Sequence, residues 1–235
     1  MSPFLGLLVA YVAGSIPAAY IAGRVTKGID LRQHGSGNLG ATNVYRVLGA
    51  KVAIAVLLFD AAKGAIPVFW LPRVANAGAD PQSLTLWAIA YGVAAILGHV
   101  RPVFLLGKGG GKGVATAAGV FAALSPGAIV VALVAWFVVL IVSGYMSLAS
   151  LAGAVALPIA ILVLGGARSA LFPVSLAVAA FVFWTHRSNI GRLRRGEEPR
   201  FGRRSTAPSR VAETDVPARR TRPETPPEPP AVTRR

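Results

Sequence analysis

The sequence predicts an all-α, polytopic membrane protein, and its composition and the spacing of its apolar runs support that prediction. Of 235 residues, 54% are hydrophobic and only 14% are charged, with a mean hydropathy of +0.60. Apolar runs recur along the chain, as expected of helices that cross a hydrocarbon core about 30 Å thick. We expect about seven membrane-spanning helices, at residues 3–22, 52–71, 84–97, 114–124, 128–142, 148–164 and 171–185.

The first run, residues 3–22, has neither a basic start nor a small-residue cleavage site. We therefore interpret it as a retained helix rather than a signal peptide. GSIP at residues 14–17 is expected to loosen or kink its end, and SPG at 125–127 predicts a tight turn. Because the shortest run has eleven residues, some spans must be tilted, extended into flanking residues or partly re-entrant.

The second run contains two ionisable residues, Asp60 and Lys63, which at i,i+3 share one helix face about halfway along the span. Charges at that depth are expensive and usually functional, so Lys63 is a candidate substrate-binding residue. The alternative is a self-neutralising pair that fastens helix packing. Both interpretations stay open at this point.

Basic residues predict the orientation of the chain. The segment 24–51 carries five Lys or Arg and the region 101–112 carries three, whereas residues 72–83 and 165–170 carry one each. The positive-inside rule therefore places the N-terminus outside and the C-terminus in the cytoplasm. Residues 1–198 form the transmembrane domain, and residues 199–235 are predicted to be a disordered basic tail because they contain almost no large apolar residue.

A segment rich in uncharged hydrogen-bond donors, GSGNLGATNVYR at residues 35–46, follows the first run. Glycines allow several backbone N–H groups to point at one oxyanion, and hydroxyl, amide and guanidinium groups add further donors. No carboxylate in the segment neutralises its arginine, so we predict a phosphate site. Its candidate residues are Gly35, Ser36, Gly37, Asn38, Thr42, Asn43 and Arg46.

A second glycine loop, GKGGGKGVAT at residues 107–116, opens into the fourth run and predicts another anion site. It is not a Walker A loop, because Leu106 stands where that motif needs glycine and Gly113 where it needs Ser or Thr. We therefore exclude a nucleoside triphosphatase. The candidate substrate-binding residues here are His99, Lys108, Gly110, Gly111, Lys112, Gly113 and Thr116.

A third polar motif, HRSNIGRLRRGEE at residues 186–198, directly follows the last run. If the helix continues, His186 and Asn189 lie on one face. Some of the arginines are the basic residues expected at the cytoplasmic end of a membrane-spanning helix. That interpretation does not explain the histidine, the asparagine or the glutamate after Gly196. The candidate site residues are His186, Arg187, Asn189 and Glu197.

The overall charge narrows the expected partners. With 24 Lys or Arg against nine Asp or Glu, the chain has a formal net charge of +15. In a membrane-embedded chain this predicts phosphorylated substrates or anionic lipid headgroups as partners, rather than nucleic acid. The sequence has no cysteine and no metal-binding or cofactor motif.

Five motifs in order resemble the bacterial acyl-phosphate-dependent glycerol-3-phosphate acyltransferases, the PlsY family. They are GSIPAAYIAGR at 14–24, GSGNLGATNVYR at 35–46, DAAKG at 60–64, GGKGVAT at 110–116 and HRSNIGRL at 186–193. The resemblance covers residues 14 to about 198. The family pattern resembles KGGKG, whereas three glycines separate Lys108 from Lys112 here, so Lys112 is the better match.

The resemblance implies a seven-span enzyme of the bacterial inner membrane with its active site on the cytoplasmic face. It would transfer a fatty acyl group from acyl phosphate to the sn-1 hydroxyl of glycerol 3-phosphate, without a cofactor, giving lysophosphatidic acid and phosphate. This is the first step of phospholipid synthesis. The soluble enzyme that produces acyl phosphate would be a partner, alongside membrane lipid.

Residue roles follow from the same resemblance. Ser36, Arg46 and other donors of the first motif would bind a substrate phosphate, and Lys112 with the glycine amides would stabilise charge on the leaving group and the carbonyl oxygen. His186 and Asn189 would position glycerol 3-phosphate, supported by Glu197. Together, the catalytic candidates are Ser36, Arg46, Lys112, His186 and Asn189.

Three questions stay open from the sequence. The base is either His186 or an oxygen of a substrate phosphate, since acyl phosphate is an activated donor. Either glycine loop could hold either phosphate. The competing function is an organic-phosphate transporter or channel, which the polar motifs disfavour because they gather on one predicted face and no internal repeat is visible. Thioester-dependent acyltransferases with a His-x4-Asp pair are excluded because no histidine has that spacing.

Overall fold

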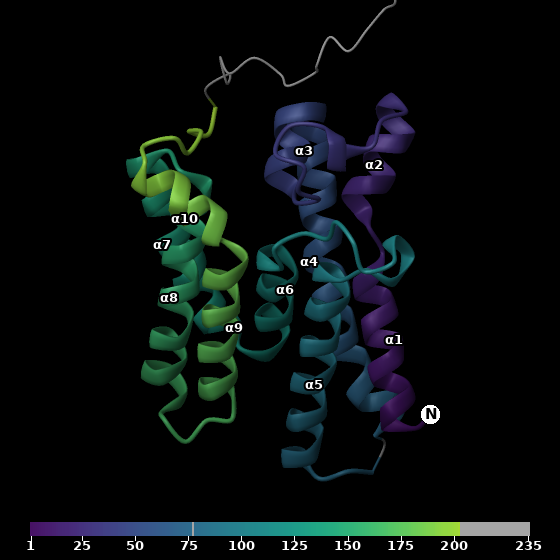
Figure 1. The fold of residues 1–235 in the computed structure, drawn as a ribbon. Coiled ribbons are helices and arrows are strands. Elements are labelled where there is room, and N and C mark those ends of the chain that lie inside the picture. Colours follow the sequence, from purple (N-terminus) through teal and green to yellow (C-terminus); the bar gives the residue numbers. More distant parts are fainter. Residues whose placement is uncertain (77, 203–235) are drawn as a thin grey trace, which may run out of the picture. The chain divides into compact units, whose positions relative to one another are not determined.

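The computed structural model describes residues 1–76 and 78–202, which form one helical unit without strands (Figure 1). Of the tail predicted at residues 199–235, residues 203–235 lie outside the described residues, so their disorder stays a prediction. The α-helices are α1 Pro3–Ser15, α2 Ala18–Lys27, α3 Ala41–Leu48, α4 Ala50–Ala75, α5 Pro81–Val100, α6 Val114–Leu124, α7 Pro126–Ser143, α8 Met146–Gly165, α9 Leu171–Thr185 and α10 Arg187–Arg194, with short 3-10 turns η1 Leu31–Gln33 and η2 Val103–Leu105.

The membrane character predicted from the sequence is confirmed. Within the described residues, five segments are long and apolar enough to cross a membrane, and α6 and α9 are shorter apolar helices. Large apolar side chains on these helices face outward, including Val142 at 82% exposure and Val163 at 76%, as expected of surfaces that contact lipid. Each of the seven predicted runs contains a helix, while the number of complete crossings and the orientation stay predictions. The five long segments are Pro3–Lys27, Ala50–Ala75, Pro81–Leu105, Pro126–Ser143 and Met146–Gly165.

The first segment is broken as GSIP predicts. α1 ends at Ser15 and α2 begins at Ala18, because Pro17 has no N–H to continue the helical ladder. The Cβ of an alanine at position 14 would lie 2.1 Å from the Ala95 carbonyl oxygen on α5. Only glycine allows α1 and α5 to pack this closely.

Several helix boundaries differ from the predicted ones. α4 continues to Ala75, and α5 begins at Pro81 because Asp80 caps it, accepting hydrogen bonds from the N–H groups of Gln82 and Ser83 at 3.0 Å each. α5 also continues past His99, which places this residue on a helix. The turn predicted at 125–127 is instead the start of α7, where proline is tolerated because the first helical N–H needs no partner.

The helices form two groups joined by α6. α1, α4 and α5 pack side by side, α7 packs against α8, and α8 packs against α9, while α6 contacts α4, α5 and α7 (Figure 1). The largest buried cluster includes residues of α6, among them Phe121, which is fully buried. α2, α3 and α10 lie toward the same end of the unit, and the loop between α5 and α6 lies beneath α3 in this view. The polar motifs are therefore gathered around this end.

Candidate active site

Asn43 on α3 holds the first motif loop in shape. Its side chain is 1% exposed, and its Oδ1 accepts the Ser36 N–H at 2.8 Å while its Nδ2 donates to the His34 carbonyl at 3.0 Å. Gly35 has φ +62, and a Cβ there would lie 2.3 Å from the Asn43 Oδ1, so this position requires glycine. Asn43 was predicted to bind substrate phosphate, but the structure turns its amide inward to the loop backbone.

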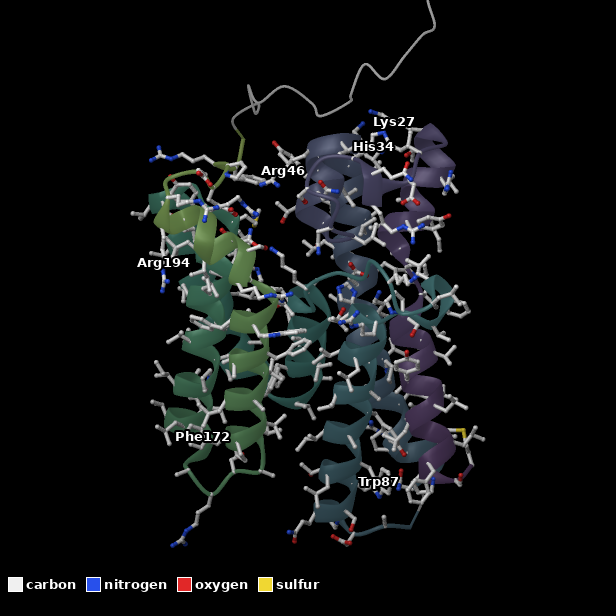
Figure 2. The ribbon with its side chains drawn as sticks, in the orientation of Figure 1. Lys27, His34, Arg46, Trp87, Phe172 and Arg194 are labelled. Carbon is white, nitrogen blue, oxygen red and sulfur yellow. The ribbon has the colours of Figure 1, made fainter. Side chains whose placement is uncertain are left out.

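The remaining donors of the first motif lie on the loop and on α3. Ser36 is exposed, and Asn38 donates its Nδ2–H to the Gly110 carbonyl at 3.4 Å, which links the two glycine loops. Figure 2 shows Arg46 between α3 and α10. The nearby Arg32 is not a free cation, because it pairs with Asp30 at 2.7 Å and lowers the pKa of that carboxyl to about 2.

The second glycine loop is packed tightly against the end of α5. A Cβ at position 110 would lie 2.2 Å from the Val100 carbonyl oxygen, and one at position 111 would lie 2.1 Å from the His99 Nε2. The Gly111 N–H donates to the His99 carbonyl at 3.3 Å, and the Thr185 hydroxyl on α9 donates to the Lys112 carbonyl at 3.2 Å. The loop therefore has a defined conformation, for which glycine leaves the necessary space.

A buried cluster beneath this loop contains Asp60, Lys63 and His99, each at most 6% exposed. The Asp60 Oδ1 lies 2.8 Å from the Lys63 Nζ and 3.5 Å from the His99 Nδ1. The Lys63 Nζ also donates to the Ile16 carbonyl at 2.8 Å, at the break between α1 and α2. These contacts support the packing interpretation of the pair, since Asp60 neutralises Lys63. A small cavity next to the cluster is also lined by Pro17, Leu39, Gly110 and Gly111.

The third motif joins the second through a chain of hydrogen bonds. Lys112 donates its Nζ–H to the Asn189 Oδ1, and the Asn189 Nδ2 donates to the Glu198 Oε1 at 2.6 Å. The Arg192 Nε completes the chain by donating to the Glu198 Oε2 at 2.7 Å. Glu197, predicted to support Asn189, instead pairs with Arg195, and both side chains are more than half exposed. Glu198 occupies the supporting position.

His186 lies at the junction of α9 and α10, because the last helix ends at Thr185 instead of continuing into the motif. Its ring is 3% exposed, and its Nδ1 lies 2.8 Å from the Val182 carbonyl oxygen. A carbonyl can only accept, so Nδ1 carries the proton and Nε2 is the acceptor. Burial, and then the charge of Lys112, lower the pKa of His186 to about 4. The imidazole is therefore neutral near pH 7.

Positive charge exceeds negative charge in this region. Burial lowers the pKa of Lys112 to about 8; the nearby Glu198 opposes this shift, and Arg192 and Arg46 add to it. Burial of part of the Arg46 side chain likewise lowers the pKa of its guanidinium, again opposed by Glu198. Three cations thus lie close to a single carboxylate. Such a cluster favours a bound anion, which would relieve the mutual repulsion of the cations.

The structure therefore brings together Arg46, Lys112, His186 and Asn189 from three separate motifs. Of the other predicted residues, Lys63 and His99 belong to the buried cluster with Asp60, and four more lie apart from both clusters. Lys108 and Arg187 are exposed, and the latter donates to the Trp184 carbonyl. Thr116 is fully buried within α6, and among the described residues its hydroxyl has no hydrogen-bond partner. Glu197 is the fourth.

Sequence reasoning missed Glu198 and Arg192, although both stand in the third motif. Glu198 lies beyond the end of α10, so helical spacing from Asn189 cannot identify it. Burial raises the pKa of the Glu198 carboxyl, but the Asn189 bond and the nearby Ser147 and Arg192 more than offset it, so the net shift is downward. The Ser147 hydroxyl lies near enough to lower the pKa of Glu198, although within the described residues it is not aligned for a hydrogen bond.

An apolar cavity extends from this cluster between α6, α7, α8 and α9. Val114 directly follows Gly113, and Val182 lies one turn before His186, so both place the cavity next to the polar site. No group of three or more His, Asp or Glu side chains in the described part of the chain is arranged to hold a metal ion. The main lining residues are Val114, Ala118, Ile129, Trp136, Gly153, Leu157, Val178 and Val182.

Comparisons with known proteins identify the family of this chain. The family model for glycerol-3-phosphate acyltransferase matches residues 4–196. A protein named glycerol-3-phosphate acyltransferase from Geobacter sulfurreducens is 45% identical over 193 residues, which cover 82% of this chain and 94% of the relative. A protein of the same name from Synechococcus elongatus is 42% identical over 198 residues, covering 84% of this chain and 93% of the relative.

A solved structure is also similar. The crystal structure of PlsY (YgiH), an integral membrane glycerol 3-phosphate acyltransferase, in its glycerol 3-phosphate form has 38% sequence identity and a TM-score of 0.75. The match covers 85% of this chain and 96% of the solved chain. Since the family model spans most of the chain and the relatives are matched over nearly their whole length, this protein belongs to the glycerol-3-phosphate acyltransferase family.

Proposed function

We propose that this chain transfers a fatty acyl group from acyl phosphate to the sn-1 hydroxyl of glycerol 3-phosphate. The products are lysophosphatidic acid and inorganic phosphate. The observation that carries the proposal is the convergence of Arg46, Lys112 and Arg192 around one carboxylate, beside a neutral histidine and at the mouth of an apolar cavity. This arrangement suits two phosphorylated substrates, one of which has a long apolar chain.

The cations and glycine amides have separable tasks in this reaction. Ser36, Asn38, Thr42 and Arg46 bind one substrate phosphate. The amides of the second glycine loop and Lys112 bind the other and stabilise the negative charge that develops on the acyl carbonyl oxygen and the departing phosphate. Glu198 and Asn189 hold the Lys112 ammonium in place. Preorganised donors of this kind lower the barrier because they need no rearrangement during the reaction.

Neutral His186 is proposed to orient the attacking hydroxyl. Its Nε2 accepts a hydrogen bond from the sn-1 hydroxyl of glycerol 3-phosphate, while its Nδ1–H stays on the Val182 carbonyl. The hydroxyl oxygen forms a bond to the acyl carbon, the bond from that carbon to the phosphate oxygen breaks, and a phosphate oxygen takes the proton. A group with a pKa of about 4 is too weak a base to keep this proton near pH 7.

The apolar cavity is proposed to hold the acyl chain, because its lining is almost entirely hydrocarbon and its mouth adjoins Gly113 and His186. The acyl carbonyl would then lie at the boundary between this cavity and the cations. The distribution of Lys and Arg supports a cytoplasmic active site in the bacterial inner membrane. There the soluble enzyme that makes acyl phosphate could deliver its product directly.

The test compares two acyl donors. Purified protein is mixed with labelled glycerol 3-phosphate and either palmitoyl phosphate or palmitoyl-CoA, with Arg46→Ala as the inactive control. We expect labelled lysophosphatidic acid from palmitoyl phosphate alone, and loss of most product with Arg46→Ala. Equal product from both donors would contradict the proposed donor. Uptake of labelled glycerol 3-phosphate into protein-containing vesicles without any acylated product would instead support the transporter.

A further inference from the structure

The segment that follows α10, residues 198–201, lies across the polar end of the helical unit; we name it the C-terminal strap. Its first residue, Glu198, holds Asn189 and Arg192. Its last residue, Phe201, stacks on Tyr45 of α3, with ring centroids 4.6 Å apart and an interplanar angle of 27°. The family model ends at residue 196, so the strap lies just beyond the matched region.

Phe201 also contacts the other group of helices. Its backbone N–H donates to the Gly144 carbonyl at 2.7 Å, in the turn between α7 and α8. The preceding Arg200 places its Nε 3.3 Å from the Tyr145 hydroxyl and its guanidinium over the Tyr145 ring at 5.3 Å. α3 packs against α2, η1 and α4, whereas α7 packs against α6 and α8. The strap thus connects elements from both sides of the site.

The strap reaches the candidate site through Tyr45. Tyr45 directly precedes Arg46, and both lie on the eight-residue helix α3. The helix ends at Leu48, and Gly49 at φ +90 separates it from α4, so α3 is a short helix with a direction of its own. A ring stacked on Tyr45 restricts the rotation and tilt of α3 and therefore the place from which Arg46 extends toward Glu198 and Lys112.

We propose that Phe201 is a positioning residue that fixes Arg46 for phosphate binding through its stack on Tyr45. Phe201 itself touches no substrate. The strap couples this stack to Glu198, three residues earlier, so the same segment sets both Arg46 and the Asn189–Lys112 chain. The proposal rests on the proposed acyl transfer, and it assigns residues 199–201 to the working enzyme instead of to the disordered tail predicted from the sequence.

The test measures kcat and KM for both substrates in Phe201→Ala, Tyr45→Ala and the double variant. Arg46→Lys first identifies the substrate whose phosphate Arg46 binds. We expect Phe201→Ala to raise the KM for that same substrate about 3- to 10-fold, with less change in kcat and in the other KM. Tyr45→Ala should do the same, and the double variant should be no worse than either single one. Phe201→Tyr keeps a stacking ring and should restore the wild-type KM.

Two truncations and a matched control complete the design. A chain ending at Gly202 should keep the wild-type KM, whereas one ending at Arg200 should behave like Phe201→Ala. Phe137→Ala removes an exposed ring from the lipid-facing part of α7 and should change neither constant. If Phe201→Ala gives no folded protein, Phe201→Leu replaces it, because it keeps apolar volume but removes the ring. Thermal unfolding of every variant separates loss of fold from loss of positioning.

The outcomes separate the two proposals. Wild-type protein without acyl transfer from acyl phosphate would overturn the proposed function. Active wild-type protein combined with an unchanged KM in Phe201→Ala, or with additive effects of Phe201→Ala and Tyr45→Ala, would overturn the positioning role alone. A uniform loss of kcat that tracks the melting temperature would show that the strap only stabilises the fold, which also overturns it.

Discussion

The burial of Lys112 predicts an alkaline limit to activity. If its ammonium stabilises the departing phosphate, only the protonated form supports the reaction. With a pKa of about 8, roughly 90% of Lys112 is protonated at pH 7 and roughly 10% at pH 9. We therefore expect kcat/KM to be nearly level from pH 7 to 7.5 and to fall about tenfold per pH unit well above pH 8.

The sign of this effect follows from the environment. Burial disfavours the charged form and lowers the pKa, so the active proton is lost at a pH where an exposed lysine would retain it. A bound phosphate favours the charged form, so the corresponding limb in kcat should lie at higher pH than the limb in kcat/KM. The assay follows transfer of a labelled acyl group to glycerol 3-phosphate at subsaturating substrate, with enzyme-free blanks for spontaneous hydrolysis of the donor.

Substitution separates Lys112 from other titrating groups. Lys112→Arg keeps a positive charge that does not titrate in this range, so its kcat/KM should be lower at pH 7 by about tenfold but level up to pH 9.5. Lys108→Arg is the matched control in the same loop, since Lys108 is exposed, and it should retain the alkaline limb. An alkaline limb that persists unchanged in Lys112→Arg, or its absence from the wild type, would refute the reasoning.

Three other changes probe the site. His186→Gln should keep the acidic limb of kcat/KM near pH 6, because this limb belongs to the substrate phosphate and the pKa of His186 is about 4. If the pH–rate profile of His186→Gln lacks this limb, His186 is the base. Gly110→Ala should lower kcat/KM at least about 100-fold in the same assay, because its Cβ would lie 2.2 Å from the Val100 carbonyl oxygen. Gly127→Ala is the control and should keep the wild-type kcat/KM, because its Cβ meets only the flexible Leu164 side chain. Full activity of Gly110→Ala would contradict the tight packing of the loop. Val178→Phe should raise the preference for lauroyl over palmitoyl phosphate about tenfold, because the new ring fills the apolar cavity about 12 Å along α9 from His186. The lipid-facing Val163→Phe should leave this preference unchanged. If Val178→Phe has the same chain-length preference as the wild type, the acyl chain lies elsewhere.

Local patterns in the sequence predicted the helices and the family. Apolar runs of near-membrane length form helices because each helix satisfies its own backbone hydrogen bonds, independent of its neighbours. The break at Pro17 was predictable for the same reason, since proline acts on its own residue and the preceding turn. The three polar motifs were also visible, because clusters of glycines, hydroxyls and cations within a few residues suit phosphate regardless of the surrounding fold.

Packing between distant segments decided which polar groups face the site. From the sequence, Asn43 was a candidate for phosphate binding and Asn189 for positioning glycerol 3-phosphate. The structure turns the Asn43 amide into its own loop and places the Asn189 amide between Lys112 and Glu198. Glu197 was the candidate chosen from the sequence, whereas the backbone path after α10 places Glu198 against Asn189 and leaves Glu197 exposed. These choices depend on contacts between residues far apart in the chain, which no local spacing specifies.

The charge state of the site was likewise decided by the tertiary structure. A histidine and a lysine have ordinary pKa values near about 6.5 and 10.4 in the sequence alone. Burial between α9, α10 and the second glycine loop lowers the pKa of His186 to about 4 and that of Lys112 to about 8. The residue types were thus determined by the sequence, whereas their protonation at neutral pH depends on how much water and how many neighbouring charges the folded chain leaves around them.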